Sequence, residues 1–208
     1  MLRLGDGRAG TIGYEMRALR SVRAIAGAVR LWQHSWPAQM READEDHWWD
    51  WRDFLARTVG RTDQLLGFDL VTRAHPTLAR FTRPLAGEHL QGLMLVEPRW
   101  ESPERRLETR IWYLASAPWN RPDRKDAHRL AGVGSALLGA AVRLSLDSGN
   151  DGVICLVPYV GALGFYRGLG FRRRITVESF DAPRRDLVLD PAQARELVQR
   201  VGAAEGQG

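Results

Sequence analysis

The sequence of 208 residues predicts one α/β domain, in which helices flank a central, twisted, mixed β-sheet. Two observations support this prediction. An apolar strand pattern at residues 108–117 precedes a glycine-containing loop and an amphipathic helix, and residues 153–157 then form a second apolar strand pattern. Strand, helix and strand in this order form a parallel unit, whereas hairpin signals upstream predict antiparallel strands. We therefore expect a sheet that is antiparallel in its N-terminal half and parallel in its C-terminal half.

Residues 1–76 are expected to supply an N-terminal strand and two helices. Residues 11–19 fit either a first strand or the start of a helix. Residues 21–36 and 46–59 each carry apolar side chains at helical spacing. This part of the chain therefore predicts two helices ahead of the main strands.

Residues 77–190 are expected to form the sheet and the ligand-binding core. Residues 77–85 and 89–97 predict a β-hairpin, because a short turn sequence with a glycine separates two apolar strand patterns. Residues 108–117 read as the next strand, which Pro118 ends. The antiparallel half of the sheet would come from these segments.

The C-terminal segments predict the remaining strands and helices. Residues 132–148 form the helix after the glycine loop, and residues 162–169 form a short second helix. Residues 171–180 and 186–189 alternate in polarity and predict a closing pair of strands. In the last segment, 191–208, we expect a helix as far as about Val201 and then a mobile tail rich in glycine and alanine.

The loop before helix 132–148 has the features of an anion site. The first amide N–H groups of a helix have no intrahelical partner, and the helix dipole adds partial positive charge there. Gly132 and Gly134 lack a Cβ, which allows left-handed backbone angles and close approach of a phosphate, and Ser135 adds a hydroxyl. The alternative is that both glycines only relax a tight loop ahead of a core helix.

Two common nucleotide-binding motifs do not fit this loop. The dinucleotide fingerprint needs a third glycine where Leu137 stands. A Walker A loop needs a lysine after its glycines, and the single lysine of the chain, Lys125, precedes them.

The ordered motifs of the chain resemble those of the GNAT superfamily of acetyl-CoA-dependent N-acyltransferases. Arg129, Gly132 and Gly134 fill the fixed places of the family's Q/R-x-x-G-x-G/A loop. About thirty residues later, the sequence that starts at Phe165 and Tyr166 matches the second signature, FY-x-x-x-G-F. The resemblance covers the core and implies a GNAT-like fold, whereas the N-terminal helices match the family least.

The resemblance implies acetyl-CoA as cofactor, with coenzyme A as product. In the family, the strand before the loop pairs with the pantetheine arm, and the loop binds the diphosphate. Carried over by motif position, the cofactor-binding residues are Leu114, Ala115, Ser116, Arg129, Leu130, Ala131, Gly132, Val133, Gly134 and Ser135.

Tyr166 occupies the place of the family's general acid, which protonates the departing thiolate. Its alternative role is an aromatic packing contact that it shares with Phe165. Glu97 at the end of one predicted strand and Glu108 at the start of the next are candidates for the general base. Either could instead be an exposed strand-end carboxylate. An amine that arrives neutral needs no base.

The acceptor is expected to be a small-molecule or peptide amine. Acids and tryptophans alternate at residues 41–53, which would suit a cationic amine, although the same pattern fits an ordinary helix with exposed carboxylates. After the strand at 108–117, Trp119 could cover the pantetheine arm and Asn120 could cap the following turn. Flanking prolines make a rigid loop an equal explanation for both residues.

Composition bounds the remaining function classes. The lone cysteine, Cys155, excludes an internal disulfide and is expected to be an inert core residue, and the five scattered histidines predict no metal site. No apolar run approaches the roughly 18 residues of a membrane span, and no signal-peptide pattern begins the chain, so we expect a cytoplasmic protein without a membrane partner. The sequence does not decide whether the protein forms a homodimer.

Three functions compete at this point. The first is an N-acetyltransferase that uses acetyl-CoA and a primary amine, and the second is a catalytically silent acyl-CoA-binding module. The third is an arginine-rich nucleic-acid-binding protein, because the formal net charge is +5. Arginines are spread along the chain and interleaved with acids, so we do not expect nucleic acid as a partner. A local basic cluster beside the loop suits phosphate instead: Arg121, Arg124, Lys125, His128 and Arg129.

Overall fold

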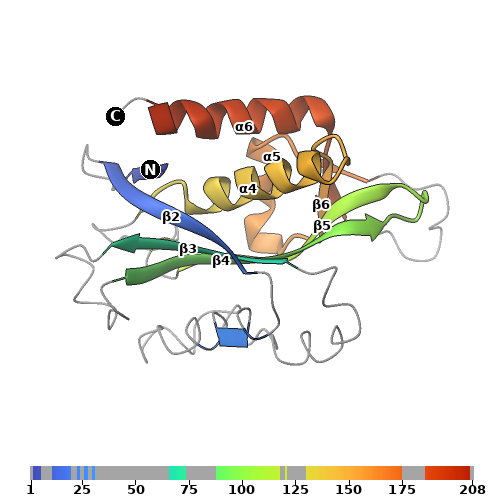
Figure 1. Cartoon of the computed structure of the whole chain (residues 1–208). Helices are drawn as coiled ribbons and strands as arrows, with labels where there is room; N and C mark the ends of the chain where they lie inside the picture. Colours follow the sequence, from blue (N-terminus) through green and yellow to red (C-terminus); the bar gives the residue numbers. More distant parts are fainter. Residues whose placement is uncertain are drawn as a thin grey trace.

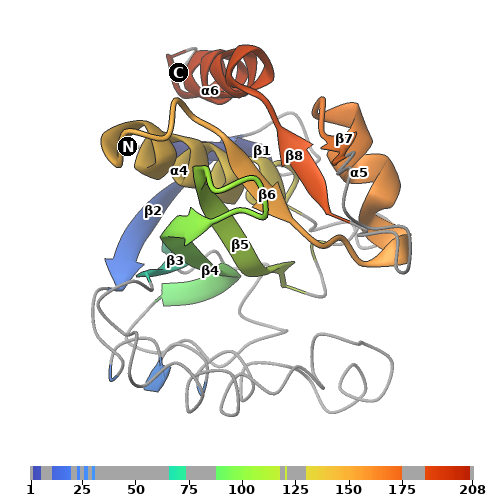
Figure 2. The ribbon, with the colours of Figure 1, turned by 90° about the vertical axis from the view of Figure 1, so that its right-hand side faces the viewer.

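A computed structural model describes residues 2–5, 11–19, 23, 26, 27, 30, 66–73, 88–117, 120, 130–174 and 186–206. The described strands form one sheet in the order β1-β2-β3-β4-β5-β6-β8-β7 (Figures 1 and 2). Their bounds are β1 Leu2–Gly5, β2 Thr11–Leu19, β3 Leu66–Arg73, β4 Glu88–Glu101, β5 Leu107–Ser116, β6 Ile154–Leu156, β7 Arg172–Arg173 and β8 Leu187–Leu189. The helices are α4 Val133–Asp147, the short 3-10 turn η5 Val160–Ala162, α5 Leu163–Gly168 and α6 Pro191–Gly206.

The sheet is mixed, as predicted. Strands β1 to β5 pair antiparallel in sequence order, and β5 pairs with β6 in parallel. Strand β8 then pairs antiparallel with both β6 and β7, and Figure 2 shows β8 between them. Among the described strands, parallel pairing is therefore confined to β5 and β6, where helix α4 makes the crossover.

The N-terminal half differs from the prediction in two places. Residues 11–19 are strand β2, but the unpredicted strand β1 precedes it and pairs with it. The predicted hairpin of residues 77–85 with 89–97 is wrong, because β3 pairs with β4 on one edge and β5 pairs with it on the other. Residues 77–85 themselves lie outside the described part of the chain. Gly67 and Asp69 interrupt the apolar pattern of β3, which hides its strand signal.

Most of the two predicted N-terminal helices lies outside the described residues. Within 21–36, residues 23, 26, 27 and 30 are described, and they are helical. The segments 46–59 and 41–53 are not described.

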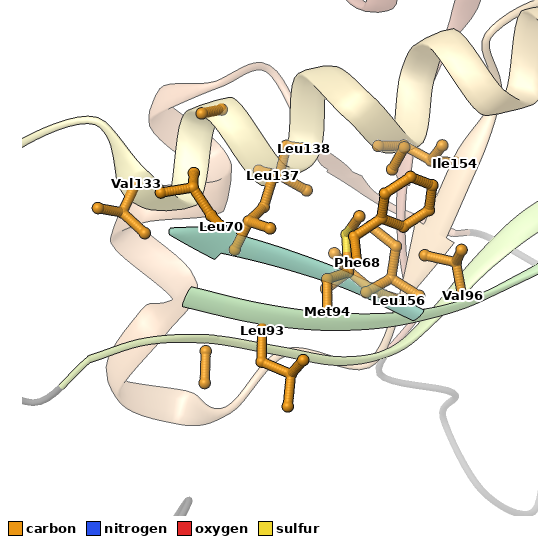
Figure 3. Close-up of a cluster of buried hydrophobic side chains, with 14 of the residues drawn as sticks. Phe68, Leu70, Leu93, Met94, Val96, Val133, Leu137, Leu138, Ile154 and Leu156 are labelled. Carbon is orange, nitrogen blue, oxygen red and sulfur yellow. The ribbon is translucent and has the colours of Figure 1, made fainter. Parts of the chain in front are cut away.

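Helix α4 was predicted within one residue at each end. Gly132 is its N-cap, with a left-handed φ of 89°, and Ser148 is its C-cap. The helix packs across β4 and β5, and α6 packs on the opposite side of α4, so that the two helices form successive layers over one face of the sheet (Figure 1). In Figure 3 the α4 side chains of Val133, Leu137 and Leu138 lie over the sheet residues Phe68, Leu70 and Met94, all of them buried. Burial of each such side chain contributes about 1.5–3 kcal/mol to folding.

The C-terminal elements follow the predicted order. Strand β6 is buried throughout, as expected for its continuous apolar run. Gly170 follows α5 and its C-cap Leu169 with a φ of 94°, the left-handed conformation in which a glycine commonly ends a helix. Helix α6 continues to Gly206, five residues beyond the expected end. Among the described residues, no helix is long and apolar enough to cross a membrane.

Candidate functional site

A cavity of about 760 Å³ opens at the carboxyl end of β5. This volume falls within the range of about 300–1,000 Å³ that is common for ligand pockets. Its described walls come from β5, the loop and first turn of α4, and the segment from β6 to α5. The lining residues are Ile111, Trp112, Leu114, Ala115, Ser116, Asn120, Leu130, Ala131, Gly132, Val133, Gly134, Ser135, Leu156, Val157, Tyr159, Gly161, Ala162, Phe165 and Tyr166.

The cavity exists because two parallel strands separate. Strand β5 pairs with β6 only from Thr109 to Ile111, and β6 ends at Leu156, while β5 continues to Ser116. On its other edge, β5 contains a bulge, since Tyr113 and Ile111 pair with consecutive residues of β4 and Trp112 is the extra residue. The last five residues of β5 therefore extend beyond the end of β6, and a ligand backbone could pair with them.

The first turn of α4 supplies a second set of backbone donors to the cavity. The N–H of Ala136 makes the first helical hydrogen bond, to the Gly132 carbonyl at 2.9 Å. No side chain caps this end, and no acidic residue occupies the first turn. The turn therefore presents amide N–H groups and the positive end of the helix dipole to the cavity, an arrangement suited to phosphate.

The lining residues can be compared with the residues predicted to bind the cofactor. Nine of the ten residues predicted to bind the cofactor line the cavity. The tenth, Arg129, lies outside the described residues, as do Trp119 and the other members of the basic cluster.

The two glycines of the loop have different physical roles. Gly132 needs its left-handed φ, as expected. Gly134 is helical, so the expected left-handed conformation is wrong at this position. A Cβ on Gly134 would lie 3.0 Å from Cζ of Phe165, so this glycine makes room for an aromatic ring from α5.

Tyr166 lines the cavity from α5 and is 7 % exposed. Its ring makes edge-to-face contacts with Phe165 and Phe171, at centroid distances of 5.1 and 5.4 Å. These contacts fix the ring plane, which agrees with the packing role. Since the same residue also lines the cavity, packing and a chemical role of the hydroxyl are compatible.

The structure gives Glu108 a different role from the one expected. Glu108 is not among the described lining residues. Its side chain is 6 % exposed, and both carboxylate oxygens accept hydrogen bonds from the guanidinium of Arg174, including one of 3.0 Å from Nη1. A carboxylate so engaged is a structural ion-pair partner rather than a base at this cavity.

Glu97 is also buried and is not a described lining residue. It accepts a hydrogen bond of 3.1 Å from the indole N–H of Trp112, which does line the cavity. The guanidinium carbon of Arg110 lies 4.6 Å from the Trp112 ring centroid and 4.5 Å from that of Trp100, within the range of cation–π contacts.

Cys155 is buried on β6, as expected. Burial, together with the negative charge of Glu108, raises the pKa of its thiol far above the usual range, so the reactive thiolate does not form at ordinary pH. Among the described residues, no group of three or more His, Cys, Asp or Glu side chains could hold a metal ion.

Tyr159 and Asn120 are among the lining residues that the sequence did not place at the cavity. Tyr159 lines it from the segment after β6, where the only signal was an aromatic residue just after the strand-ending Pro158. Asn120 also lines it and makes buried hydrogen bonds to Gln91 and Leu130, whereas the turn that it was expected to cap lies outside the described residues.

Comparison with known proteins agrees with this architecture. No family model matches the sequence, and no curated protein sequence matches it. Among solved structures, a tyrosine-to-phenylalanine mutant of KacT is 13% identical, with 88% of this chain and 98% of that chain covered and a TM-score of 0.53. AtaTR bound with acetyl-CoA is 12% identical, with 88% and 97% covered and a TM-score of 0.53. An AtaT mutant toxin bound to the C-terminus of the antitoxin AtaR and acetyl-CoA is 14% identical, with 88% and 97% covered and a TM-score of 0.51. At these identities the likeness establishes the fold alone, which is a GNAT-like α/β fold.

Proposed function

We propose that this protein transfers an acetyl group from acetyl-CoA to the primary amine of a small molecule or peptide. The observation that carries the proposal is the convergence, on one cavity, of the free end of β5, the uncapped first turn of α4 and Tyr166. AtaTR and the AtaT mutant toxin, which have a similar fold, are bound to acetyl-CoA in their solved structures, and this supports the choice of donor.

The residues of the cavity fit the two polar parts of coenzyme A. The amide N–H groups of Val133, Gly134 and Ser135 suit the diphosphate, because no acid and no capping side chain competes for that turn. Leu114 to Ser116 extend past the end of β6, so their backbone groups suit the amides of the pantetheine arm. The apolar wall between these two regions suits the methylene groups of that arm.

The chemistry needs a held thioester, a neutral amine and a proton source. Acetyl-CoA supplies the activated acyl group when it is bound. A backbone N–H of residues 114–116 would donate a hydrogen bond to the thioester oxygen and stabilise the negative charge that develops there, as oxyanion-hole donors do. As the amine nitrogen bonds to the acetyl carbon and the carbon–sulfur bond breaks, the Tyr166 hydroxyl would donate a proton to the departing sulfur, and the proton lost by the nitrogen would restore the tyrosine through solvent. We assign no side-chain base, because no Asp or Glu is among the described lining residues, and we infer that the amine reacts in its neutral form.

The test has a binding step and a turnover step. Titration calorimetry with acetyl-CoA and with coenzyme A should show one saturable site per chain. A panel of amines that includes polyamines, aminoglycosides, amino-acid amides and peptide N-termini should then release free thiol from acetyl-CoA with at least one member.

The outcomes separate the competing functions. Binding without turnover on any amine would favour a silent acyl-CoA-binding module. No binding at millimolar acetyl-CoA would overturn the proposal, and a salt-dependent affinity for DNA in that case would favour nucleic-acid binding.

A further inference from the structure

We propose that Asn120 and Gln91 act as a positioning pair, which fixes the phosphate-binding loop at a set place relative to the end of β5. This role rests on the proposed function, because it concerns the loop that would hold the diphosphate. The pair connects three segments that are far apart in sequence: β4, the residues after β5, and the start of the loop.

Asn120 uses both ends of its side-chain amide within the protein. It is 6 % exposed. Its Nδ2 donates to Oε1 of Gln91 at 2.8 Å and to the Gln91 carbonyl at 3.4 Å, while its Oδ1 accepts from the N–H of Leu130 at 2.9 Å. The backbone N–H of Leu130 requires an acceptor and the Gln91 carbonyl requires a donor, so only one orientation of the amide satisfies both.

Gln91 occupies a bulge in β4. Leu90 and Gly92 pair with the adjacent β3 residues Val71 and Leu70, so Gln91 is the extra residue between them. Bulges redirect side chains and are frequent next to functional sites. Gln91 is completely buried, and its carbonyl also accepts a hydrogen bond of 2.8 Å from the N–H of Ala117, directly after β5.

The next residue of β4 fixes the far end of the same loop. Gly92 pairs with Ser116, and a Cβ on Gly92 would lie 2.8 Å from Cγ1 of Val133 and 2.9 Å from Cδ1 of Leu137. The absence of a side chain at Gly92 therefore lets the first turn of α4 lie directly on the sheet. Two consecutive residues of β4 thus hold the two ends of the loop. Gln91 holds Leu130 through Asn120, and Gly92 lies in close contact with Val133.

This double attachment explains how an exposed loop can hold a ligand in register. Ala131 and Gly132 are exposed, but they lie between two buried, fixed positions. The first-turn amides of α4 consequently keep a constant distance from the end of β5, where the thioester would react. Preorganisation of this kind lowers the cost of binding and of reaching the reactive geometry.

Three variants test the pair. Asn120→Leu removes both hydrogen-bonding ends and keeps the number and branching of the side-chain heavy atoms. Gln91→Met combined with Asn120→Leu also removes the buried amide that bonds to Asn120. Asn150→Leu is the matched control, because Asn150 is also 6 % exposed but bonds to Pro98 and Thr109 and does not line the cavity.

In Asn120→Leu the dissociation constant for coenzyme A should rise about tenfold, the effect expected when a buried hydrogen bond that orders a binding loop is lost. The double variant should recover part of the lost thermal stability and keep the raised dissociation constant. Asn150→Leu should lower the melting temperature and leave the dissociation constant unchanged. If the dissociation constant for coenzyme A rose in each of the three variants in step with the fall in melting temperature, the role of the pair would be purely structural and the proposal would be overturned.

Hydrogen–deuterium exchange provides a readout that needs no ligand. Peptides covering residues 130–135 should exchange faster in Asn120→Leu than in the wild type, and at the wild-type rate in Asn150→Leu. Unchanged exchange in Asn120→Leu overturns the positioning role, whatever the wild type binds. If exchange rises but the wild type binds no coenzyme A, the attachment of the loop stands and the proposed function fails.

Discussion

Gly132 is the residue whose backbone conformation the candidate site depends on most directly. Its φ of 89° begins α4 and turns the first amides of the helix toward the cavity. Gly132→Ala should lower the free energy of unfolding by about 1–2 kcal/mol, because a Cβ disfavours left-handed angles. It should also weaken binding of coenzyme A, since relief of the strain would move the first turn.

The matched control for this change is Gly164→Ala. Gly164 is helical in α5, and a Cβ there meets nothing within 4 Å. This variant should be stabilised, by up to about 1 kcal/mol, and should bind coenzyme A normally. Urea denaturation and ligand titration on both variants measure the difference, and equal effects at the two glycines would argue against a special role of Gly132.

Tyr166 is the one side chain that donates a proton in the proposed mechanism. Tyr166→Phe should keep the ring contacts with Phe165 and Phe171, so stability and the Michaelis constant for acetyl-CoA should change little. The turnover number should fall about 100-fold, the lower end of the range for general acids. Steady-state kinetics checks this, with Tyr159→Phe as the control in the same cavity. An unchanged turnover number in Tyr166→Phe would leave the tyrosine a packing role only.

At the level of elements, an ion pair ties the start of β5 to the end of β7. Arg174 bonds to Glu108, which is buried, and to Glu104, which is 36% exposed. Glu108→Ala removes the buried carboxylate and leaves the guanidinium with the more exposed Glu104, so we expect a loss of about 3 kcal/mol in the free energy of unfolding, the lower end of the range for a broken buried pair. Glu104→Ala should cost less than about 1 kcal/mol, because water screens an exposed pair.

This pair of variants also tests the corrected role of Glu108. Activity per folded molecule should be the same in Glu108→Ala as in the wild type, because the carboxylate does not line the cavity. Chemical denaturation gives the stabilities, and kinetics well below the unfolding transition gives the activity. A specific loss of turnover in Glu108→Ala would restore it as a candidate base.

Elements with local signals were predictable, and pairings between distant segments were not. Helix α4 has a glycine at each end and an apolar face between them, and the predicted bounds differ from the observed ones by one residue. The partner of β4 was missed because β3 lies outside the expected hairpin, and its pairing is set by burial under α4 rather than by a turn signal.

For the whole molecule, a specific ligand should stabilise the folded state in proportion to the logarithm of its concentration. Acetyl-CoA at 100 times its dissociation constant adds about 2.7 kcal/mol. For a domain of this size, that corresponds to a rise in melting temperature of about 5–10 °C. Differential scanning fluorimetry measures the shift. NAD at the same concentration is the control, since the loop lacks the dinucleotide fingerprint, and an equal shift with NAD would point to a general anion site.

The sequence by itself determined the α/β class, the mixed sheet, the glycine loop, helix α4 and the order of the motifs. These depend on local periodicity and on residues with special backbone freedom, which can be recognised from short stretches of chain. Only the tertiary structure decided which glycine needs a left-handed angle, that Glu108 belongs to an ion pair, and that Asn120 joins β4 to the loop before α4. The physical reason is that hydrogen bonds and buried charges form between groups that are close in space, whatever their separation in sequence. Glu108 and Arg174 are 66 positions apart, and no local sequence pattern indicates that they meet.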